Sequence, residues 1–304
     1  MLKDPCGRPV ESIRISVTKE CNLDCFYCHR EGESSQTSTE MTPEEIQRIV
    51  DIAASFGIRK VKLTGGEPLL REDILEIVKR IRDTPGVEEV SMTTNGLLLA
   101  GYGDRLKEAG LARVNVSLDT LKPEKFRQIT GLDALEKVIR GIEEASKAGL
   151  HPVKANMVLL KGVNEDEVTN MIRLAREKSI ILQIIELESP DENKLYNTYH
   201  VDLDMVEDSL EKAAERTTVR RMHHRKKYHL RNGGEVEIVK PMHNTEFCQN
   251  CNRIRVTSDG KLKPCLFRND NLVDLLGPMR RGAPEKTLRE LFLEAVRRRE
   301  PYFA

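Results

Sequence analysis

The sequence has no apolar run approaching the roughly 20 residues that a helix needs to cross a bilayer, which excludes a transmembrane helix. It begins without an apolar signal region, so we expect a protein that is not secreted and works in the cytoplasm. Its net charge is zero, with 49 basic and 49 acidic residues, and gives no global reason to expect nucleic acid or an anionic membrane as a partner. What remains is a globular chain of 304 residues, long enough for one large α/β barrel or two modest domains.

The sequence also lacks the pattern of a disulfide-stabilised protein. Seven cysteines are an odd number, and they occur in a long chain with no export signal. Six of the seven form two triplets, at positions 21, 25 and 28 and at positions 248, 251 and 265. Cys6 stands apart from both, and we expect it to be an incidental free thiol. Each triplet therefore calls for a chemical role.

Short β-branched runs alternate with helical stretches over the first 190 residues. Such alternation is typical of a parallel barrel or an open parallel sheet, here of six βα units. Thr42-Pro43-Glu44-Glu45 gives the first helix a capped start. Strands are expected at 12–17, 60–64, 89–93, 113–117, 153–159 and 181–186, and helices at 43–56, 73–82, 105–109, 135–148 and 165–178.

The alternation ends at the loop sequence 189–193. Beyond it we expect a polar helix over 202–217, short strands with a turn at 232–234, and a last helix over 286–299. We therefore predict an α/β fold in two parts. Residues 1–215 form a partial (β/α)6 barrel of the TIM type, and residues 216–304 form a smaller α+β region that carries the second cysteine triplet.

Cys21, Cys25 and Cys28 form a CxxxCxxC pattern directly after the first expected strand. A [4Fe–4S] cluster normally takes four cysteines, so three would leave one iron with an open position, as catalytic metal sites require. From spacing alone, the alternatives are a zinc site with His29 as fourth ligand, or three reduced buried cysteines.

Cys248, Cys251 and Cys265 form a CxxC pair followed, after thirteen residues, by a third cysteine. A zinc ribbon would usually bring a second CxxC pair, although His243 offers a fourth ligand and keeps zinc open here too. An incomplete ligand set could instead leave an iron open for a substrate.

The first triplet, with Tyr27 just before its third cysteine, resembles the radical S-adenosylmethionine (SAM) superfamily. Gly65-Gly66-Glu67-Pro68, after the second strand, resembles that superfamily's GGEP motif, in which adjacent glycines let the backbone approach a ligand closely. The resemblance implies that the open iron holds SAM. It also implies that an electron from the cluster cleaves SAM into methionine and a 5′-deoxyadenosyl radical, which the protein positions.

Together the two triplets resemble the GTP 3′,8-cyclase family of molybdenum-cofactor biosynthesis. The resemblance implies that the radical takes the ribose 3′-hydrogen of GTP and that C3′ then adds to guanine C8, giving 3′,8-cyclo-7,8-dihydroguanosine triphosphate. The supporting strings are Gly7-Arg8-Pro9, the GGEP string with its flanks at 63–69, Thr93-Thr94-Asn95-Gly96, Asn115-Val116-Ser117-Leu118-Asp119 and Ser258-Asp259-Gly260-Lys261.

The resemblance also implies cofactors and partners. The cofactors are SAM and two [4Fe–4S] clusters, one holding SAM and one binding the guanine edge of GTP. An electron donor is needed, and the product passes to cyclic pyranopterin monophosphate synthase. We expect a monomer or a homodimer, in cytosolic low-oxygen conditions that keep both clusters stable.

Residue roles carry over one position at a time. Cys21, Cys25 and Cys28 match the ligands of the SAM cluster, and Cys248, Cys251 and Cys265 match those of the GTP cluster. Tyr27, Gly66 and Ser117 match SAM-contacting positions. Arg14, Lys62, Thr93, Lys154, Arg253 and Arg255 match GTP-contacting positions.

Elementary geometry supports part of this set. Thr93 and Ser117 fall at the carboxyl ends of expected strands, where barrel active sites collect. Arg253 and Arg255 have the same parity, so in an extended segment they project to one side. Arginine offers rigid, bidentate donors to a triphosphate.

The chain departs from the family at three places. Lys62 stands where the family has arginine, which keeps the charge and loses the guanidinium fork. Glu188 stands where a methionine contacts the adenine of SAM, so that role is not carried over. The ending Pro301-Tyr302-Phe303-Ala304 lacks the Gly-Gly of bacterial members and resembles archaeal members, and we assign it no role.

Residues 216–231 contain seven Arg and Lys residues and three His residues, with no acidic residue. Nucleic-acid binding is one interpretation, but Tyr228 is the single aromatic in the stretch, which argues against base-stacking platforms. A solvated basic loop and a lining of the triphosphate channel are the others, and the sequence does not separate these two.

Two further functions stay open. One is a radical SAM peptide-modifying enzyme with an auxiliary cluster, although such enzymes usually carry more C-terminal cysteines and would not need Arg253 and Arg255. The other is a zinc-stabilised protein that uses the basic stretch on nucleic acid. Metal content separates them, because the enzyme should hold about eight irons per chain and no zinc.

Overall fold

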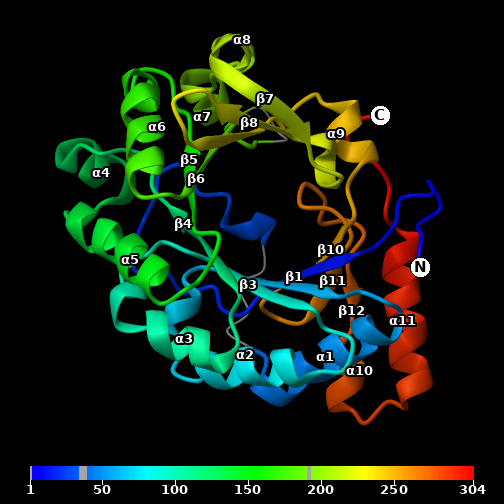
Figure 1. The fold of residues 1–304 in the computed structure, drawn as a ribbon. Helices are drawn as coiled ribbons and strands as arrows, with labels where there is room; N and C mark the ends of the chain where they lie inside the picture. The colour runs from blue at the N-terminus through cyan, green and yellow to red at the C-terminus, as the bar shows by residue number, and fades with distance from the viewer. Residues whose placement is uncertain (1, 34–39, 190–192) are drawn as a thin grey trace.

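The computed structural model describes residues 2–33, 40–189 and 193–304, and a curved twelve-stranded sheet forms its centre (Figure 1). The strands are β1 (Ser12–Ser16), β2 (Lys60–Thr64), β3 (Glu89–Thr94), β4 (Arg113–Ser117), β5 (Lys154–Val158), β6 (Ile181–Ile185), β7 (Ala214–Val219), β8 (Lys226–Leu230), β9 (Glu235–Val239), β10 (Arg253–Val256), β11 (Lys261–Lys263) and β12 (Val273–Asp274). They are ordered β12-β11-β10-β1-β2-β3-β4-β5-β6-β9-β8-β7.

Helices surround the outer face of this sheet (Figure 1). They are α1 (Pro43–Ser55), α2 (Ile74–Asp83), α3 (Gly103–Ala109), α4 (Pro123–Thr130), α5 (Leu135–Lys147), α6 (Val168–Glu177), α7 (Lys194–Tyr199), α8 (Asp204–Ala213), α9 (Thr245–Gln249), α10 (Leu276–Arg280) and α11 (Glu285–Arg297). The predicted capping box of α1 is confirmed, because Thr42 and Glu45 exchange both side-chain to backbone hydrogen bonds. No helix among the described residues is long and apolar enough to span a bilayer.

Strands β1 to β6 lie side by side and parallel, as the six predicted βα units require. The C-terminal region then extends this sheet at both ends: β9 pairs parallel with β6, and β10 pairs parallel with β1. Strands β7, β8, β11 and β12 add antiparallel edges. In the described part of the chain β7 and β12 do not pair, so the barrel stays open.

Two sets of side chains alternate along the parallel strands. Ile13 and Ile15 of β1 and Val61 and Leu63 of β2 are buried in the hydrophobic core, which the outer helices cover. Polar side chains of the opposite parity, such as Arg14, line the inside of the curved sheet. Register reinforces the pattern, because Arg14 lies directly beside Lys62 on one neighbouring strand and beside Arg255 on the other. The interior of the open barrel is therefore polar.

The predicted helix over 202–217 was too long. Helix α8 ends at Ala213, and residues 214–219 form β7, which pairs antiparallel with β8. Three β-branched residues end this strand, Thr217, Thr218 and Val219, and each has a cross-strand partner on β8. These residues favour a strand over continuation of the helix that precedes them. The predicted turn at 232–234 is confirmed between β8 and β9. The loop predicted at 189–193 lies mostly outside the described residues.

Candidate active site

A cavity of about 910 Å³ lies inside the curved sheet, and every residue predicted to bind a cluster, SAM or GTP lines it. These residues are Cys21, Cys25, Cys28, Cys248, Cys251, Cys265, Tyr27, Gly66, Ser117, Arg14, Lys62, Thr93, Lys154, Arg253 and Arg255. The fold thus brings both ends of the chain to one place.

The first cysteine triplet lies on the loop after β1. The backbone of this loop is held against the end of α4, because Phe26 N–H donates to the carbonyl of Ile129. The hydroxyl of Tyr27 donates to Asp119 Oδ2 at 2.6 Å, just beyond β4. Burial raises the pKa of Asp119 to about 6, although the Tyr27 hydrogen bond opposes the rise. Tyr27 therefore joins the cysteine loop to the carboxyl end of the sheet.

The second triplet is held by the two terminal segments of the chain. Arg8 donates to the carbonyl of Cys248 at 2.8 Å, and Arg299 donates to the carbonyl of Cys251 at 2.7 Å. Buried Asp4 pairs with both arginines, at 2.8 and 3.1 Å. Arg8 belongs to the string Gly7-Arg8-Pro9, whereas no local pattern marks Arg299, because its partners lie far away in the sequence.

The donor set fits iron–sulfur clusters. Cys28, Cys251 and Cys265 each accept a hydrogen bond from the backbone N–H two residues later, at 3.4 Å in the case of Cys28. Such donors stabilise thiolates and orient metal ligands. Within the described ranges, no group of three His, Cys, Asp or Glu residues could hold a single metal ion. A [4Fe–4S] cluster does not need its cysteines to converge on one ion, because each cysteine binds a separate iron.

The GGEP loop lies directly against the segment that leads to Cys21. Gly66 N–H donates to the carbonyl of Thr18, and Glu67 N–H donates to that of Glu20, at 2.8 and 2.7 Å. A Cβ on Gly66 would lie 2.0 Å from the carbonyl oxygen of Glu20, so no larger residue fits without moving the backbone.

Glu67 fixes the same loop to the end of β3. Its buried carboxylate accepts hydrogen bonds from the hydroxyl of Thr94 and from the backbone N–H of Asn95.

Glu31 links the cysteine loop to two predicted GTP-binding arginines. Its carboxylate pairs with Arg14 at 3.2 Å and with Arg255 at 2.7 Å, and it accepts from the hydroxyl of Thr64 at 2.8 Å. Burial opposes ionisation, but the charges of Arg14 and Arg255 outweigh it and hold the pKa of Glu31 well below its usual value. Sequence reasoning missed Glu31, which only the fold places between these arginines.

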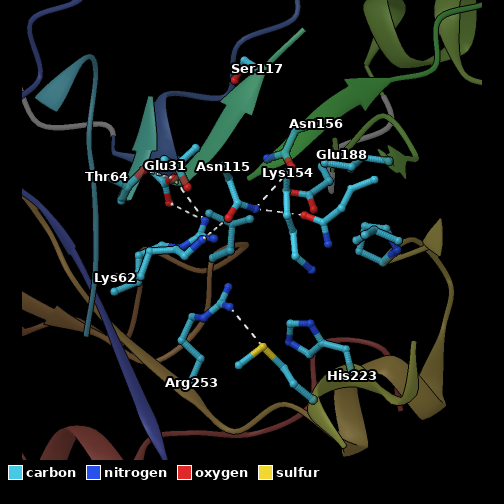
Figure 2. Close-up of a pocket in the computed structure, with 18 of the residues that line it drawn as sticks. Glu31, Lys62, Thr64, Asn115, Ser117, Lys154, Asn156, Glu188, His223 and Arg253 are labelled. Carbon is cyan, nitrogen blue, oxygen red and sulfur yellow. Dashed lines mark hydrogen bonds and ion pairs between the residues drawn. The ribbon is translucent and has the colours of Figure 1, made fainter. Parts of the chain in front are cut away.

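Amide side chains connect the strands across the cavity wall (Figure 2). Lys62 Nζ donates to Asn115 Oδ1 at 2.9 Å, and Asn115 Nδ2 donates to Gln183 Oε1 at 3.0 Å. Gln183 Nε2 then donates to Glu237 Oε2 at 2.6 Å. This chain of hydrogen bonds runs from β2 through β4 and β6 to β9 and fixes the amine of Lys62.

Glu237 is the carboxylate at the end of that chain. Its Oε1 accepts from Lys154 at 2.5 Å and from Arg220 at 2.7 Å, and its side chain is fully buried. Burial works against ionisation, but the charges of Lys154, Arg220 and Arg225 hold the pKa of Glu237 at about 2. Glu237 was not predicted as a site residue, because nothing local marks it.

Figure 2 shows Lys154, Arg253 and His223 pointing into the same space. The guanidinium of Arg253 lies 3.1 Å from the sulfur of Met222, a weak acceptor, and has no carboxylate partner among the described residues. It is therefore available to an anionic ligand.

Comparison with known proteins identifies the family. The Radical SAM superfamily profile matches residues 15–175, and the Molybdenum Cofactor Synthesis C profile matches residues 180–304. A probable GTP 3′,8-cyclase of Thermococcus kodakarensis is 54% identical over 309 residues, covering 100% of both chains. One from Methanothermobacter thermautotrophicus is 50% identical over 305 residues, covering 99% of both. The chain belongs to the GTP 3′,8-cyclase family.

Members of the GTP 3′,8-cyclase family are radical SAM enzymes of molybdenum-cofactor biosynthesis, and SAM and [4Fe–4S] clusters are this protein's cofactors. Solved structures agree on the fold. Streptococcus suis SuiB bound to the precursor peptide SuiA has a TM-score of 0.65 at 16% identity, covering 85% of this chain and 60% of that one. AnSMEcpe with bound AdoMet has a TM-score of 0.61 at 22% identity, covering 86% and 76%.

Two features left open by the sequence now have positions in this GTP 3′,8-cyclase. Glu188 lines the cavity, 3.4 Å from the ring of His29 beside the first triplet. Part of the basic stretch lines the cavity as well, namely Arg220, Arg221, His223, Arg225 and Lys227. Other members of the stretch, such as Arg216 and Arg231, are exposed.

Replacing Gly66 with alanine should weaken SAM binding to this GTP 3′,8-cyclase by about tenfold or more, because the new Cβ forces the GGEP loop away from Glu20. The measurement is calorimetric titration of SAM into the anaerobic holoenzyme. Gly101→Ala is the matched control, since a Cβ there meets no atom within 4 Å and its SAM affinity should match the wild type. An unaltered affinity in Gly66→Ala would contradict the assignment.

Proposed function

We propose that this GTP 3′,8-cyclase binds SAM at the first cysteine triplet and GTP between the two triplets. Tyr27, Gly66 and Ser117 contact SAM. Arg14, Lys62, Thr93, Lys154, Arg253 and Arg255 contact GTP. The observation that carries this proposal is the convergence of both triplets and all of these residues on one cavity.

The charge of the cavity supports an anionic substrate. Among the residues that the structure describes, twelve Lys and Arg residues line it, against eight Asp and Glu residues. The whole chain is neutral, so the excess of positive charge is concentrated here. A cleft with one sign of charge and low-dielectric walls attracts ligands of the opposite sign. A triphosphate, with several negative charges, fits this excess.

The two clusters and SAM, when bound, supply the radical chemistry that the family uses. The residues of this chain orient the substrate. Glu31 and Glu237 hold four basic side chains in place before the ligand arrives, and such preorganised groups need little reorganisation during the reaction. Cys248, Cys251 and Cys265 would hold the second cluster, which would bind the guanine edge of GTP.

The proposal extends to organisation and partners. Residues 1–215 generate the radical, and residues 216–304 supply the second cluster and part of the GTP site. The enzyme works in the cytoplasm as a monomer or homodimer, takes electrons from a donor protein or reductant, and passes its product to cyclic pyranopterin monophosphate synthase.

Arg253→Ala tests the GTP site. We expect GTP affinity to fall about tenfold to a hundredfold, because a charge-assisted contact to phosphate is lost. Affinity is measured by calorimetry, and anaerobic incubation with GTP, SAM and a reductant, followed by mass analysis, reports the cyclised product. Arg140→Ala, on the exposed face of α5, should leave both measurements unchanged. Wild-type GTP affinity in Arg253→Ala would remove this residue from the site.

A further inference from the structure

The turn between β7 and β8 is built into the wall of the cavity. Arg220 N–H donates to the carbonyl of Arg225 at 2.8 Å and closes the turn, while the Arg220 side chain pairs with Glu237. His223 N–H donates to the carbonyl of Asn250 at 2.8 Å, so the turn is tied to the loop of the second triplet.

The same turn contains strained backbone. His223 and His224 have φ angles of 60° and 51°, a left-handed conformation that residues other than glycine rarely adopt. The ring of His223 stacks on Phe247 with 3.8 Å between centroids and 21° between planes, which helps to hold this conformation. Such strain persists only where the surroundings enforce it, and it is concentrated at functional sites.

Arg225 is the last residue of the turn, and its guanidinium has no ion-pair partner among the described residues. Its Nε is buried and has no hydrogen-bond partner, and its side chain makes no ion pair within the described ranges. Burial, together with the charges of Arg220, Arg14 and Arg113, lowers its pKa to about 10, against the opposing effect of Glu237. It therefore stays a cation at neutral pH. The residue as a whole is half-buried, so the cost falls on this one donor: a buried N–H without a partner is unfavourable unless a ligand supplies the acceptor.

Several other cations around the cavity do have partners. Arg225 and Arg253 differ from these partnered cations, because neither arginine has a carboxylate within ion-pair distance in the part of the chain that is described. Lys60 and Lys62 of the lining also lack a carboxylate there, and the amine of Lys62 donates to Asn115 instead. Sequence reasoning assigns Arg253 to GTP and gives Arg225 no role. The partnered cations are Arg14 and Arg255 with Glu31, Lys154 and Arg220 with Glu237, and Arg113 with Glu89.

We propose that Arg225 is a phosphate-binding residue of this enzyme, which together with Arg253 takes the oxygens of the GTP triphosphate. The inference rests on GTP as the substrate of the cavity. A polyphosphate suits the position better than the guanine ring does, because the positive charges near Arg225 outnumber the single carboxylate of Glu237 and a multiply charged anion balances them. The guanidinium fork also matches phosphate oxygens bidentately.

The test compares ligands that share or lack phosphates. GTP, guanosine and inorganic triphosphate are titrated calorimetrically into the anaerobic holoenzyme of the wild type, Arg225→Gln and Arg225→Lys. We expect Arg225→Gln to weaken GTP and inorganic triphosphate about tenfold to a hundredfold and to leave guanosine affinity, iron content and GTP-independent SAM cleavage unchanged. Arg225→Lys should recover part of the loss. Arg216→Gln, from the same basic stretch on the exposed edge strand, should match the wild type.

Two results would overturn the proposal: wild-type GTP affinity in Arg225→Gln, or an equal loss for guanosine, which would indicate a purely structural role. If Arg225→Gln does not fold, Arg225→Met takes its place with the same expectation. Failure of the GTP assignment itself would look different, because the wild type would then bind GTP no more tightly than guanosine.

Discussion

Replacing Cys25 with alanine is expected to abolish the formation of 5′-deoxyadenosine from SAM and to reduce the iron content from about eight to about four per chain. Cys25 lies on the loop after β1, and Asn22 and Tyr27 tie that loop to Asn95 and Asp119 at the ends of β3 and β4. The loop keeps its place in the variant, so only a ligand is lost. Two cysteines are then too few to hold the first cluster, whereas the second triplet is untouched.

Cys6 provides the matched control for Cys25. It is the cysteine that belongs to neither triplet, its side chain is exposed, and it does not line the cavity. Cys6→Ala should keep full iron content, SAM cleavage and product formation. Iron is measured chemically after anaerobic reconstitution, and 5′-deoxyadenosine by chromatography with a reductant present. Deoxyadenosine formation in Cys25→Ala at more than a trace would show that Cys25 is not a cluster ligand.

The first half of the fold could be predicted because its signals are local. Each βα unit has its own β-branched run, and the capping box of α1 needs only Thr42 and Glu45, which lie within four consecutive residues. The pairing of β9 with β6 and of β10 with β1 is different, because the partners are distant in sequence and no regular βα alternation leads from one to the other. Sequence reasoning placed them in a separate region, whereas the structure has them in one continuous sheet with the barrel strands.

The same distinction applies to the active site. The cysteine triplets and the GGEP string are spacings within a few residues, so they can be read directly from the sequence. Glu31, Glu237 and Arg225 have no such signal, since each acts through partners on other strands. Glu237 becomes a site residue only when β9 lies beside β6 and brings its carboxylate to Lys154 and Gln183. The counter-ions of a charged cavity are fixed by tertiary structure rather than by local pattern.

Replacing Cys265 with alanine should have a different effect from Cys25→Ala. Cys265 follows β11, and its loss leaves Cys248 and Cys251 as an incomplete pair beside the cavity, although Arg8 and Arg299 still hold their backbone in place. The first triplet is intact, so about four irons per chain and SAM cleavage should remain.

Formation of the cyclised product by Cys265→Ala should fall by more than about a hundredfold, because even changes around a metal ligand cost about tenfold to a hundredfold. Phosphate-binding residues such as Arg253 remain, so GTP still enters, but its guanine ring loses the second cluster that would orient it. Deoxyadenosine should therefore still form while the mass of the cyclised product is missing. Wild-type cyclisation of GTP in this variant would refute the role of the second triplet, and loss of deoxyadenosine as well would show that the two triplets do not act separately.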